Sequence, residues 1–233
     1  MNWSIIVFAY NEEGALAKTV NQAAEFLTKN AGDWEIILVD DGSTDKTPAI
    51  AGVLQQQIST LKVIRHQLNK GIGEALRSGY LTAQYDYVCA VPGDGQFDIW
   101  ELEKVEPFAY TMFYSFYRPQ PDYNFYRTIL HRSNRFFNRI FLGITLHDVN
   151  WIKVYRKEQL SFTGIELHSS LVESELAAKL LKAGAQVKQL PSVYMSRMAG
   201  TPKGGSLKTV LQAISETLNL IGVVRRFKGR LGK

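Results

Sequence analysis

A short apolar segment that ends in two adjacent carboxylates constrains the fold of this chain more than any other feature. Residues 36–39 are Ile-Ile-Leu-Val, and Asp40 and Asp41 follow at once, before a turn at residues 42–44. An uninterrupted apolar strand of this length suits the interior of a parallel sheet that helices cover on both faces. Ligands of such sheets bind at the carboxyl ends of the strands. Asp40 and Asp41 are therefore candidates to accept hydrogen bonds from ribose hydroxyls or from a base.

The sequence around this segment repeats the pattern of a strand followed by a helix. Strands are expected at residues 3–9, 36–39, 61–65 and 87–91, and helices at residues 15–28, 47–57 and 74–83. This alternation predicts a doubly wound α/β fold with a mostly parallel central sheet flanked by helices. Asp45 stands where an N-cap of the 47–57 helix is expected. The alternative for Asp40 and Asp41 is that one of them caps a helix and the other is solvated.

The second half of the chain continues with strands and helices of a less regular order. Strands are expected at residues 110–117, in the segment 148–155 and at residues 186–190, and helices at residues 99–105 (capped by Asp98), 127–142 and 171–183. Gly184 suits the C′ position of the 171–183 helix. A final amphipathic helix is indicated by an apolar face of Leu207, Leu211, Ile214, Leu218, Ile221 and Val224. We divide the chain into a main domain, residues 1–206, and a C-terminal amphipathic helix with a basic tail, residues 207–233.

The net charge of the chain is concentrated at its C-terminus. Lys and Arg number 27 against 22 Asp and Glu, a formal net charge of +5. Residues 225–233 hold five of the basic residues and no acidic one, so the rest of the chain is formally neutral. This distribution argues against a broad nucleic-acid-binding face and for a local basic tail. An apolar helix face next to such a tail packs on the core or lies on an anionic membrane surface.

The sequence shows neither a signal peptide nor an apolar run of the roughly 18 residues that cross a bilayer. Its one cysteine, Cys89, lies in an apolar segment and is expected to be a core residue rather than a nucleophile. A single cysteine also excludes an internal disulfide, which fits a reducing compartment. We expect a cytoplasmic protein, with the C-terminal helix as the candidate for peripheral contact at the cytoplasmic face of a membrane.

A glycine-flanked carboxylate follows the strand at residues 87–91. Asp94 lies between Gly93 and Gly95, and Gln96 comes two residues later. A carboxylate and an amide oxygen are hard ligands, suited to Mg²⁺ or Mn²⁺ that holds a diphosphate. Taken alone, the segment is more typical of a simple turn than of a metal site.

Five motifs, taken in their order along the chain, resemble glycosyltransferase family 2 enzymes of the GT-A fold. Within that family they resemble most the dolichol-phosphate mannosyltransferase and bacterial polyprenyl-phosphate glycosyltransferase branch. The motifs are IIVFAYNEE at residues 5–13, VDDGSTD at 39–45, NKGIG at 69–73, DGQ at 94–96 and RMAGTPK at 197–203. They cover nearly the whole chain and specify the family more closely than the substrate.

The resemblance implies roles for individual residues. It places Ala9, Tyr10, Glu12 and Asp41 at the nucleoside, with Asp40 nearby. It assigns Asp94 and Gln96 to a metal, Mg²⁺ or Mn²⁺, on the donor diphosphate. It puts Arg197 and Lys203 on a loop that meets donor or acceptor phosphates, and it matches Glu175 to an acidic position on a later helix. The catalytic candidates are thus Asp94, Glu175, Arg197 and Lys203, and Lys70 is a further candidate to assist electrostatically at the nucleotide.

The chain departs from the family pattern at three places. Phe8 stands where the family commonly has Pro. Pro92 replaces the first carboxylate of the usual Asp-x-Asp metal motif, which leaves Asp94 and Gln96 as the ligands. The segment after Asp148 lacks a glycine that is frequent in relatives, and it lies on the acceptor side. The transmembrane helices of many bacterial relatives are also absent from this sequence.

These features predict a metal-dependent, inverting transfer of a sugar from a UDP- or GDP-linked donor to a polyprenyl phosphate. A lipid phosphate is ionised near neutral pH and attacks without a base. A sugar hydroxyl of a glycan is the alternative acceptor, and it needs a base such as Glu175. Two other classes compete: a nucleotidyltransferase, whose glycine-rich signature is not seen here, and a non-catalytic nucleotide-binding or membrane-surface module.

Overall fold

The computed structural model describes residues 1–119, 139–193, 195 and 207–231, with the backbone alone for residues 207–214. This part of the chain forms a seven-stranded sheet of order β3-β2-β1-β4-β6-β5-β7. The neighbours among β1 to β4 are parallel, β6 runs antiparallel to β4 and β5, and β7 is parallel to β5. The strands are β1 (Trp3–Ala9), β2 (Trp34–Asp40), β3 (Leu61–Arg65), β4 (Tyr87–Pro92), β5 (Met112–Tyr117), β6 (Lys153–Arg156) and β7 (Gln186–Pro191).

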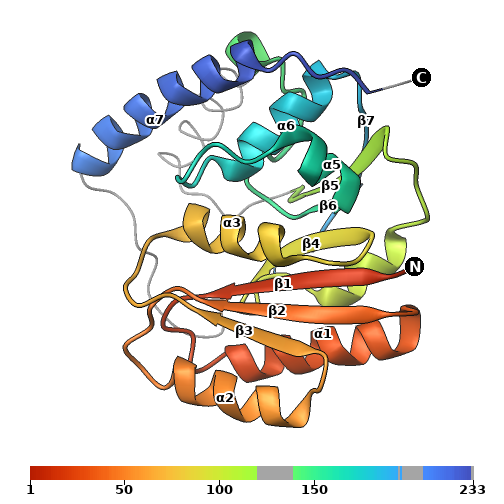
Figure 1. Cartoon of the computed structure of the whole chain (residues 1–233), viewed down its shortest axis with the longest axis vertical. Helices are drawn as coiled ribbons and strands as arrows, with labels where there is room; N and C mark the ends of the chain where they lie inside the picture. Colours follow the sequence, from red (N-terminus) through yellow and green to blue (C-terminus); the bar gives the residue numbers. More distant parts are fainter. Residues whose placement is uncertain (120–138, 194, 196–206, 232–233) are drawn as a thin grey trace.

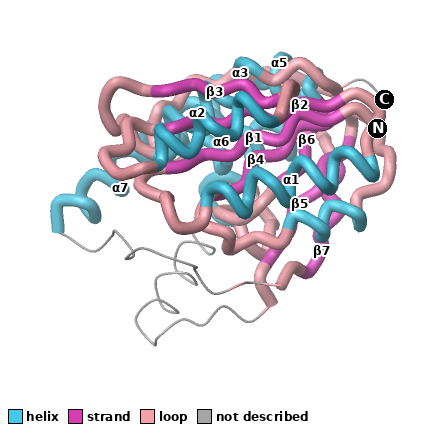
Figure 2. Tube along the Cα trace, turned by 90° about the horizontal axis from the view of Figure 1, so that it is seen from below, coloured by secondary structure: helices cyan, strands magenta, loops and turns pink. Residues whose placement is uncertain are grey.

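Helices cover both faces of the sheet (Figure 1). Seen from below in Figure 2, α1 and α2 lie across one face of the sheet. The 3₁₀ helix η1 packs into the core cluster on that same face. The opposite face carries α3, α5, α6 and α7. The helices are α1 (Leu16–Asn30), α2 (Thr47–Gln57), η1 (Ile99–Lys104), α3 (Ile72–Thr82), α5 (Lys157–Thr163), α6 (Val172–Lys182) and α7 (Leu207–Arg226). The predicted α/β architecture, a mostly parallel central sheet flanked by helices, is confirmed.

The central strands show why an unbroken apolar segment forms this sheet. Ile36 and Leu38 of β2 point into the core beneath α1 and α2, whereas Ile37 and Val39 point into the core beneath α3. All four are fully buried, because side chains alternate between two covered faces. Burying each such side chain contributes about 1.5–3 kcal/mol. Cys89 of β4 is also buried, and its burial raises the pKa of the thiol, which confirms that it is a core residue.

Several expected elements differ from the structure in detail. The strand expected from residue 110 begins at Met112, and Asp98 accepts a hydrogen bond from Trp100 N–H as expected, although the helix it caps is 3₁₀. The helix α5 was not anticipated. Of the helix expected at 127–142, the structure describes only residues 139–142, and residues 127–138 lie outside the described residues.

The helix α7 packs on the core through its C-terminal half. Leu220, Val223 and Val224 are buried in the same core cluster as the apolar face of α6. Leu218, which was assigned to the apolar face, is instead 64% exposed, because the face in contact with α6 is rotated toward residues 220 and 223. No helix among the described residues is long and apolar enough to cross a membrane.

Candidate active site

The turn after β1 and the turn after β2 are joined by side chain to backbone hydrogen bonds. Asn11, with a positive φ of 56°, accepts from Thr44 N–H through its side-chain oxygen. The other bonds run from Asn11 N–H to Ser43 Oγ, from Glu12 N–H to Thr47 Oγ1, from Glu13 N–H to Asp45 Oδ2 and from Lys46 N–H to Glu13 Oε2. The turn that carries Tyr10 and Glu12 is therefore fixed beside the strand end that carries Asp40 and Asp41.

Asp45 supports the start of α2 one residue before the N-cap position. Its Oδ1 accepts from Thr47 N–H at 2.9 Å, and its Oδ2 accepts from Glu13 N–H at 3.2 Å. Partial burial works in the opposite direction, but these hydrogen bonds lower the pKa of the Asp45 carboxyl. Asp45 was expected at the N-cap, but α2 begins at Thr47 with Lys46 in that position, so Asp45 supports the first turn from one residue earlier and links it to the neighbouring turn.

Asp41 holds the loop that follows β3. Its Oδ1 lies 2.7 Å from His66 Nδ1 and accepts from Lys70 N–H at 3.0 Å, and its Oδ2 accepts from Gly71 N–H at 2.8 Å. The same loop passes against Gly42, which has a φ of +72°. A Cβ at residue 42 would lie 2.4 Å from the Leu68 carbonyl carbon. The carboxylate is buried. In this structure it shapes the wall of the predicted nucleoside pocket.

Asp40 forms the turn at the end of β2. It is completely buried, its Oδ1 accepts from Ser43 N–H at 3.0 Å, and its Oδ2 lies 3.4 Å from Arg65 Nε. These contacts turn the chain into the segment that bonds to Asn11. Neither Arg65, the last residue of β3, nor His66, which follows it, was singled out in the sequence, because neither belongs to a motif. Only the strand order places them beside the two aspartates.

The loop after β4 brings Asp94 to the same edge of the sheet. Gly93 N–H donates to Phe8 O at 2.9 Å, and a Cβ at Gly93 would lie 3.2 Å from Ala9 Cβ. Asp94 Oδ1 accepts from Gln96 N–H at 3.0 Å, and Gly95 between them has a φ of +75°. The loop that carries the predicted metal residue Asp94 thereby packs, through Gly93, against the predicted nucleoside residue Ala9.

The side chains at this loop fit a divalent cation that is coordinated mainly by phosphate oxygens of a bound substrate. Among the described residues no group of three or more His, Cys, Asp or Glu side chains could hold a metal. Mg²⁺ keeps several waters and is commonly bound by one or two carboxylates together with phosphate oxygens of the substrate. The Asp94 carboxylate, 4% exposed at the end of a central strand, matches that mode, and Pro92 at the strand end offers no second carboxylate.

A cavity of about 530 Å³ lies between the loop before α3, the loop before α6 and the helix α7. Lys70 and Gly71 line one wall, and Ser169, Glu216 and Asn219 line the others. The two loops approach closely because residue 73 is glycine: a Cβ there would lie 2.0 Å from the Ser169 carbonyl oxygen. The NKGIG segment thus packs against the 166–170 loop on one side and holds Asp41 on the other.

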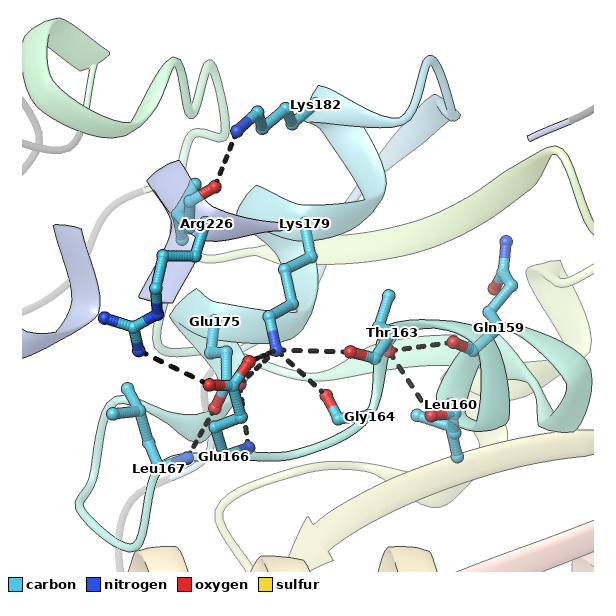
Figure 3. Close-up of polar contacts among 11 residues, drawn as sticks. Gln159, Leu160, Thr163, Gly164, Glu166, Leu167, Glu175, Lys179, Lys182 and Arg226 are labelled. Carbon is cyan, nitrogen blue, oxygen red and sulfur yellow. Dashed lines mark hydrogen bonds and ion pairs between the residues drawn. The ribbon is translucent and has the colours of Figure 1, made fainter. Parts of the chain in front are cut away.

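Glu175, a predicted catalytic residue, is completely buried in α6. Its Oε1 accepts from Glu166 N–H at 2.8 Å and from Lys179 Nζ at 2.6 Å, and its Oε2 accepts from Leu167 N–H at 2.9 Å. Figure 3 shows the Lys179 ammonium group between Glu175, Glu166 and the carbonyl oxygens of the preceding loop. The Glu175 carboxylate holds the loop of residues 166 and 167 in place. This geometry argues against its use as a base.

Other predicted residues fall on different parts of the site. Lys70 lines the cavity beside α7, as described above, and its backbone N–H bonds Asp41. Arg197 and Lys203 lie outside the described residues. Asp148 is buried and its Oδ2 accepts from Arg118 Nε at 2.7 Å, an ion pair that the sequence did not indicate because the two residues lie 30 positions apart.

Residues 4–164, more than half of the chain, match the sequence profile described as Glycosyl transferase family 2. Dolichyl-phosphate beta-glucosyltransferase of Saccharomyces cerevisiae is 32% identical over 108 residues, which are 44% of this chain and 32% of that protein. Dodecaprenyl-phosphate galacturonate synthase of Rhizobium johnstonii is 26% identical over 241 residues, covering 98% of this chain and 69% of that protein. The chain thus spans about a third of the first relative's length.

Among solved structures, glucosyl-3-phosphoglycerate synthase from Mycobacterium tuberculosis in complex with Mn²⁺, UDP and phosphoglyceric acid superimposes with a TM-score of 0.70. The sequences are 18% identical, and the match covers 95% of this chain and 78% of that one. At this identity the likeness shows the fold. The curated relatives include polyprenyl-phosphate sugar transferases, the branch that the sequence motifs predicted. Together with the profile match, the geometry at the ends of β1, β2 and β4 shows that the chain belongs to glycosyltransferase family 2.

Proposed function

We propose that the protein transfers a sugar from a nucleoside diphosphate donor to a polyprenyl phosphate, with inversion at the anomeric carbon and with the help of Mg²⁺ or Mn²⁺. The observation that carries the choice of acceptor is the state of the acidic side chains around α6. Glu175 is held by Lys179, Glu173 by Lys153 and Asp148 by Arg118. A hydroxyl acceptor needs a base, whereas a lipid phosphate is already ionised and attacks unaided.

The donor side of the proposal rests on Asp94 and on the turns that surround it. A diphosphate at the carboxyl ends of β1 and β4 would meet Asp94, which would hold the cation together with phosphate oxygens. When bound, the cation stabilises the charge that develops on the leaving diphosphate. Solved relatives of the same fold bind UDP with Mn²⁺ or Mg²⁺, which supports a nucleoside diphosphate sugar as the donor class.

The nucleoside moiety would lie against Tyr10, Glu12 and the strand end that carries Asp40 and Asp41. Because the hydrogen bonds between the two turns fix this wall before a ligand arrives, little ordering is required on binding. Lys70, and Arg197 and Lys203 on the later loop, would supply positive charge near the phosphates. Gln96 would complete the loop around the cation.

We also propose that the C-terminal helix and tail meet an anionic membrane face from the cytoplasm. Arg225, Arg226, Lys228 and Arg230 are basic residues at this end of the chain, and all four end or follow α7 at exposed positions. Each basic residue near an anionic surface contributes about 1 kcal/mol of attraction. A peripheral contact of this kind would bring the enzyme to a lipid-borne acceptor.

The test is transfer of labelled sugar from UDP- and GDP-linked donors to polyprenyl phosphate in anionic vesicles. We expect label in the lipid fraction with Mg²⁺ or Mn²⁺ and its loss with a chelator. Label on a glycan hydroxyl, with none on the lipid, would assign the alternative acceptor. Nucleotide binding without transfer to either acceptor would favour a non-catalytic module.

A further inference from the structure

A second, smaller cavity lies beside the Asp94 loop on the face of the sheet that α3 and α6 cover. Its volume is about 190 Å³, and Phe8, Ala90 and Trp151 are among its lining residues. Phe8 links the cavity to the loop that carries Asp94, because Phe8 O accepts the hydrogen bond from Gly93 N–H, one residue before Asp94. The cavity thus opens next to the place where a donor diphosphate would end.

The cavity also borders the loop that Asp41 holds. Ile72 lines it, and Ile72 directly follows Gly71, whose N–H bonds Asp41. Leu76, one turn further along α3, lines the same wall. A group attached to a diphosphate between Asp41 and Asp94 would therefore lie in front of this opening.

One carboxylate, that of Glu173 in the first turn of α6, lines this apolar cavity. Its Oε1 accepts a hydrogen bond from Tyr80 OH, and its Oε2 accepts from Tyr155 OH at 2.9 Å and lies 3.2 Å from Lys153 Nζ. The side chain remains 14% exposed. A carboxylate has about four lone-pair sites, so these three contacts leave it able to accept from a ligand.

The groups behind Glu173 are rigid. The Lys153 side chain has no exposed surface, and its Nζ also donates to Val149 O at 2.7 Å and to Trp151 O at 3.1 Å. Burial, with the nearby Glu173 charge, raises the pKa of the Tyr80 and Tyr155 hydroxyls, which therefore stay protonated as donors. A buried ion pair with this many hydrogen bonds fixes the carboxylate in one position.

The size and lining of the cavity specify the kind of group it takes. Pockets for drug-sized ligands measure about 300–1,000 Å³, so a cavity of about 190 Å³ suits one ring rather than a nucleotide. Apolar and aromatic walls match the C–H faces of a pyranose, and a fixed carboxylate accepts hydrogen bonds from its hydroxyls. A neutral, hydroxylated ring satisfies both requirements.

We propose that this cavity binds the sugar of the nucleoside diphosphate donor and that Glu173 accepts a hydrogen bond from one of its hydroxyls. The proposal rests on the proposed function and deepens it, because it assigns the sugar subsite to a residue outside the family motifs. Held at this wall, the ring is fixed relative to the diphosphate at Asp94. Glu173 then selects among sugars by the position of the hydroxyl that faces it.

The experiment compares the dissociation constants of UDP-glucose and UDP, and of GDP-mannose and GDP, by calorimetry with Mn²⁺ and without acceptor. In Glu173→Gln, which keeps the side-chain volume, we expect the ratio of sugar-nucleotide to nucleotide dissociation constants to rise about 10-fold or more, as for loss of a hydrogen bond to a charged group. The constant for the nucleotide itself should stay within about twofold, which a general loss of structure would not allow.

A second variant, Ala90→Leu, fills the cavity and leaves Glu173 unchanged, so it tests the subsite even where Glu173→Gln folds poorly. We expect the same rise in the ratio. An unchanged ratio in both variants overturns the sugar subsite, and a rise in Ala90→Leu alone overturns the role of Glu173. Wild-type protein that binds the sugar nucleotide but transfers nothing to polyprenyl phosphate contradicts the proposed function alone, because binding is measured without acceptor.

Discussion

The edge of the sheet at β1, β2 and β4 and the layer formed by α6 are stabilised in different ways. At the sheet edge, short polar side chains bond backbone N–H groups of neighbouring turns, as Asp41 does with Lys70 and Gly71. At α6, carboxylates pair with buried lysines: the completely buried Glu175 with Lys179 of the same helix, and Glu173, which is 14% exposed, with Lys153 of β6. The first arrangement joins residues of two sequence motifs, VDDGSTD and NKGIG. The second lies outside the motifs: Glu175 and Lys179 are one helical turn apart, whereas Glu173 and Lys153 are brought together only by the fold.

The two regions therefore hold two kinds of carboxylate, which differ in the effect expected from substitution. Asp94, at the sheet edge, lies on a glycine loop that a ligand can approach, whereas Glu175 lies beneath a loop that it anchors. Substitution at the first should remove activity and spare the fold. Substitution in the second should weaken the fold.

The largest effect is expected at Asp94. Asp94→Asn removes the negative charge that would hold the cation, so sugar transfer should fall by at least about 100-fold, since loss of outer-shell partners of a metal alone costs about 10–100-fold. The measurement is initial transfer rate against Mn²⁺ concentration. Asp98→Asn is the control, because Asp98 caps η1. Equal losses in both variants would contradict a metal role for Asp94.

The next effect is on stability. Lys179→Met leaves the Glu175 carboxylate buried without its cation, and breaking a buried pair in this way costs about 3–5 kcal/mol. Urea unfolding measures the loss. Lys182→Met, three residues along the same helix, removes a partly exposed lysine that donates to Val224 O and should cost much less. A similar small loss in both variants would show that Lys179 is not the anchor.

Close packing at Gly73 gives an intermediate effect. In Gly73→Ala the new Cβ meets the Ser169 carbonyl oxygen, and displacing this backbone should cost about 1–3 kcal/mol. Gly52→Ala is the matched control, because nothing lies within 4 Å of its Cβ position in the middle of α2, and it should stabilise by about 0.5–1 kcal/mol. Opposite signs in the two unfolding free energies are the expected result, and the same sign would contradict the packing.

The smallest expected effect is a pH dependence of the free energy of unfolding that arises from Glu166. The hydrogen bond from Lys179 lowers the pKa of Glu166 below its usual 4.5, against a smaller opposing effect of burial. A lowered folded pKa adds stability above pH 4.5 that is lost as the pH falls through the folded value. Because Glu166 is about half exposed, the term should stay below about 1 kcal/mol.

The comparison is the stability of Glu166→Gln and of the wild type from pH 3 to pH 7. The two curves should converge at the acid end and separate toward neutrality. Glu103→Gln, at an exposed position of η1, serves as the reference for a general change in charge. A difference between Glu166→Gln and the wild type that is the same at every pH would contradict the linkage.

The same contrast explains what could be predicted from the sequence. The strand and helix order of residues 3–92 and the place of Asp40, Asp41 and Asp94 follow from periodicity and from motifs that are contiguous. Glu173 and His66 carry no local signal, because their partners Lys153 and Asp41 lie 20 and 25 residues away. Glu175 was assigned by position on a helix, and only packing showed that its carboxylate is directed into the loop of residues 166 and 167.

The helix α7 shows the same limit. Its length and position were predicted, but the rotation that buries Leu220 and exposes Leu218 depends on the surface of α6. The spacing of apolar residues alone locates the buried face of a helix only to within about one residue on either side. The missed helix α5 is short and follows β6 without a cap motif that the sequence makes evident.

The most direct test of the central claim offers the protein two lipids that differ in one group. Vesicles contain either polyprenyl phosphate or the corresponding polyprenol, and labelled sugar is supplied from the donor that the wild type binds, with Mn²⁺. The account predicts label on the phosphate and none on the alcohol, because the acidic side chains around α6 are engaged in ion pairs. Label on the alcohol, or on a glycan hydroxyl in place of the lipid phosphate, would contradict it.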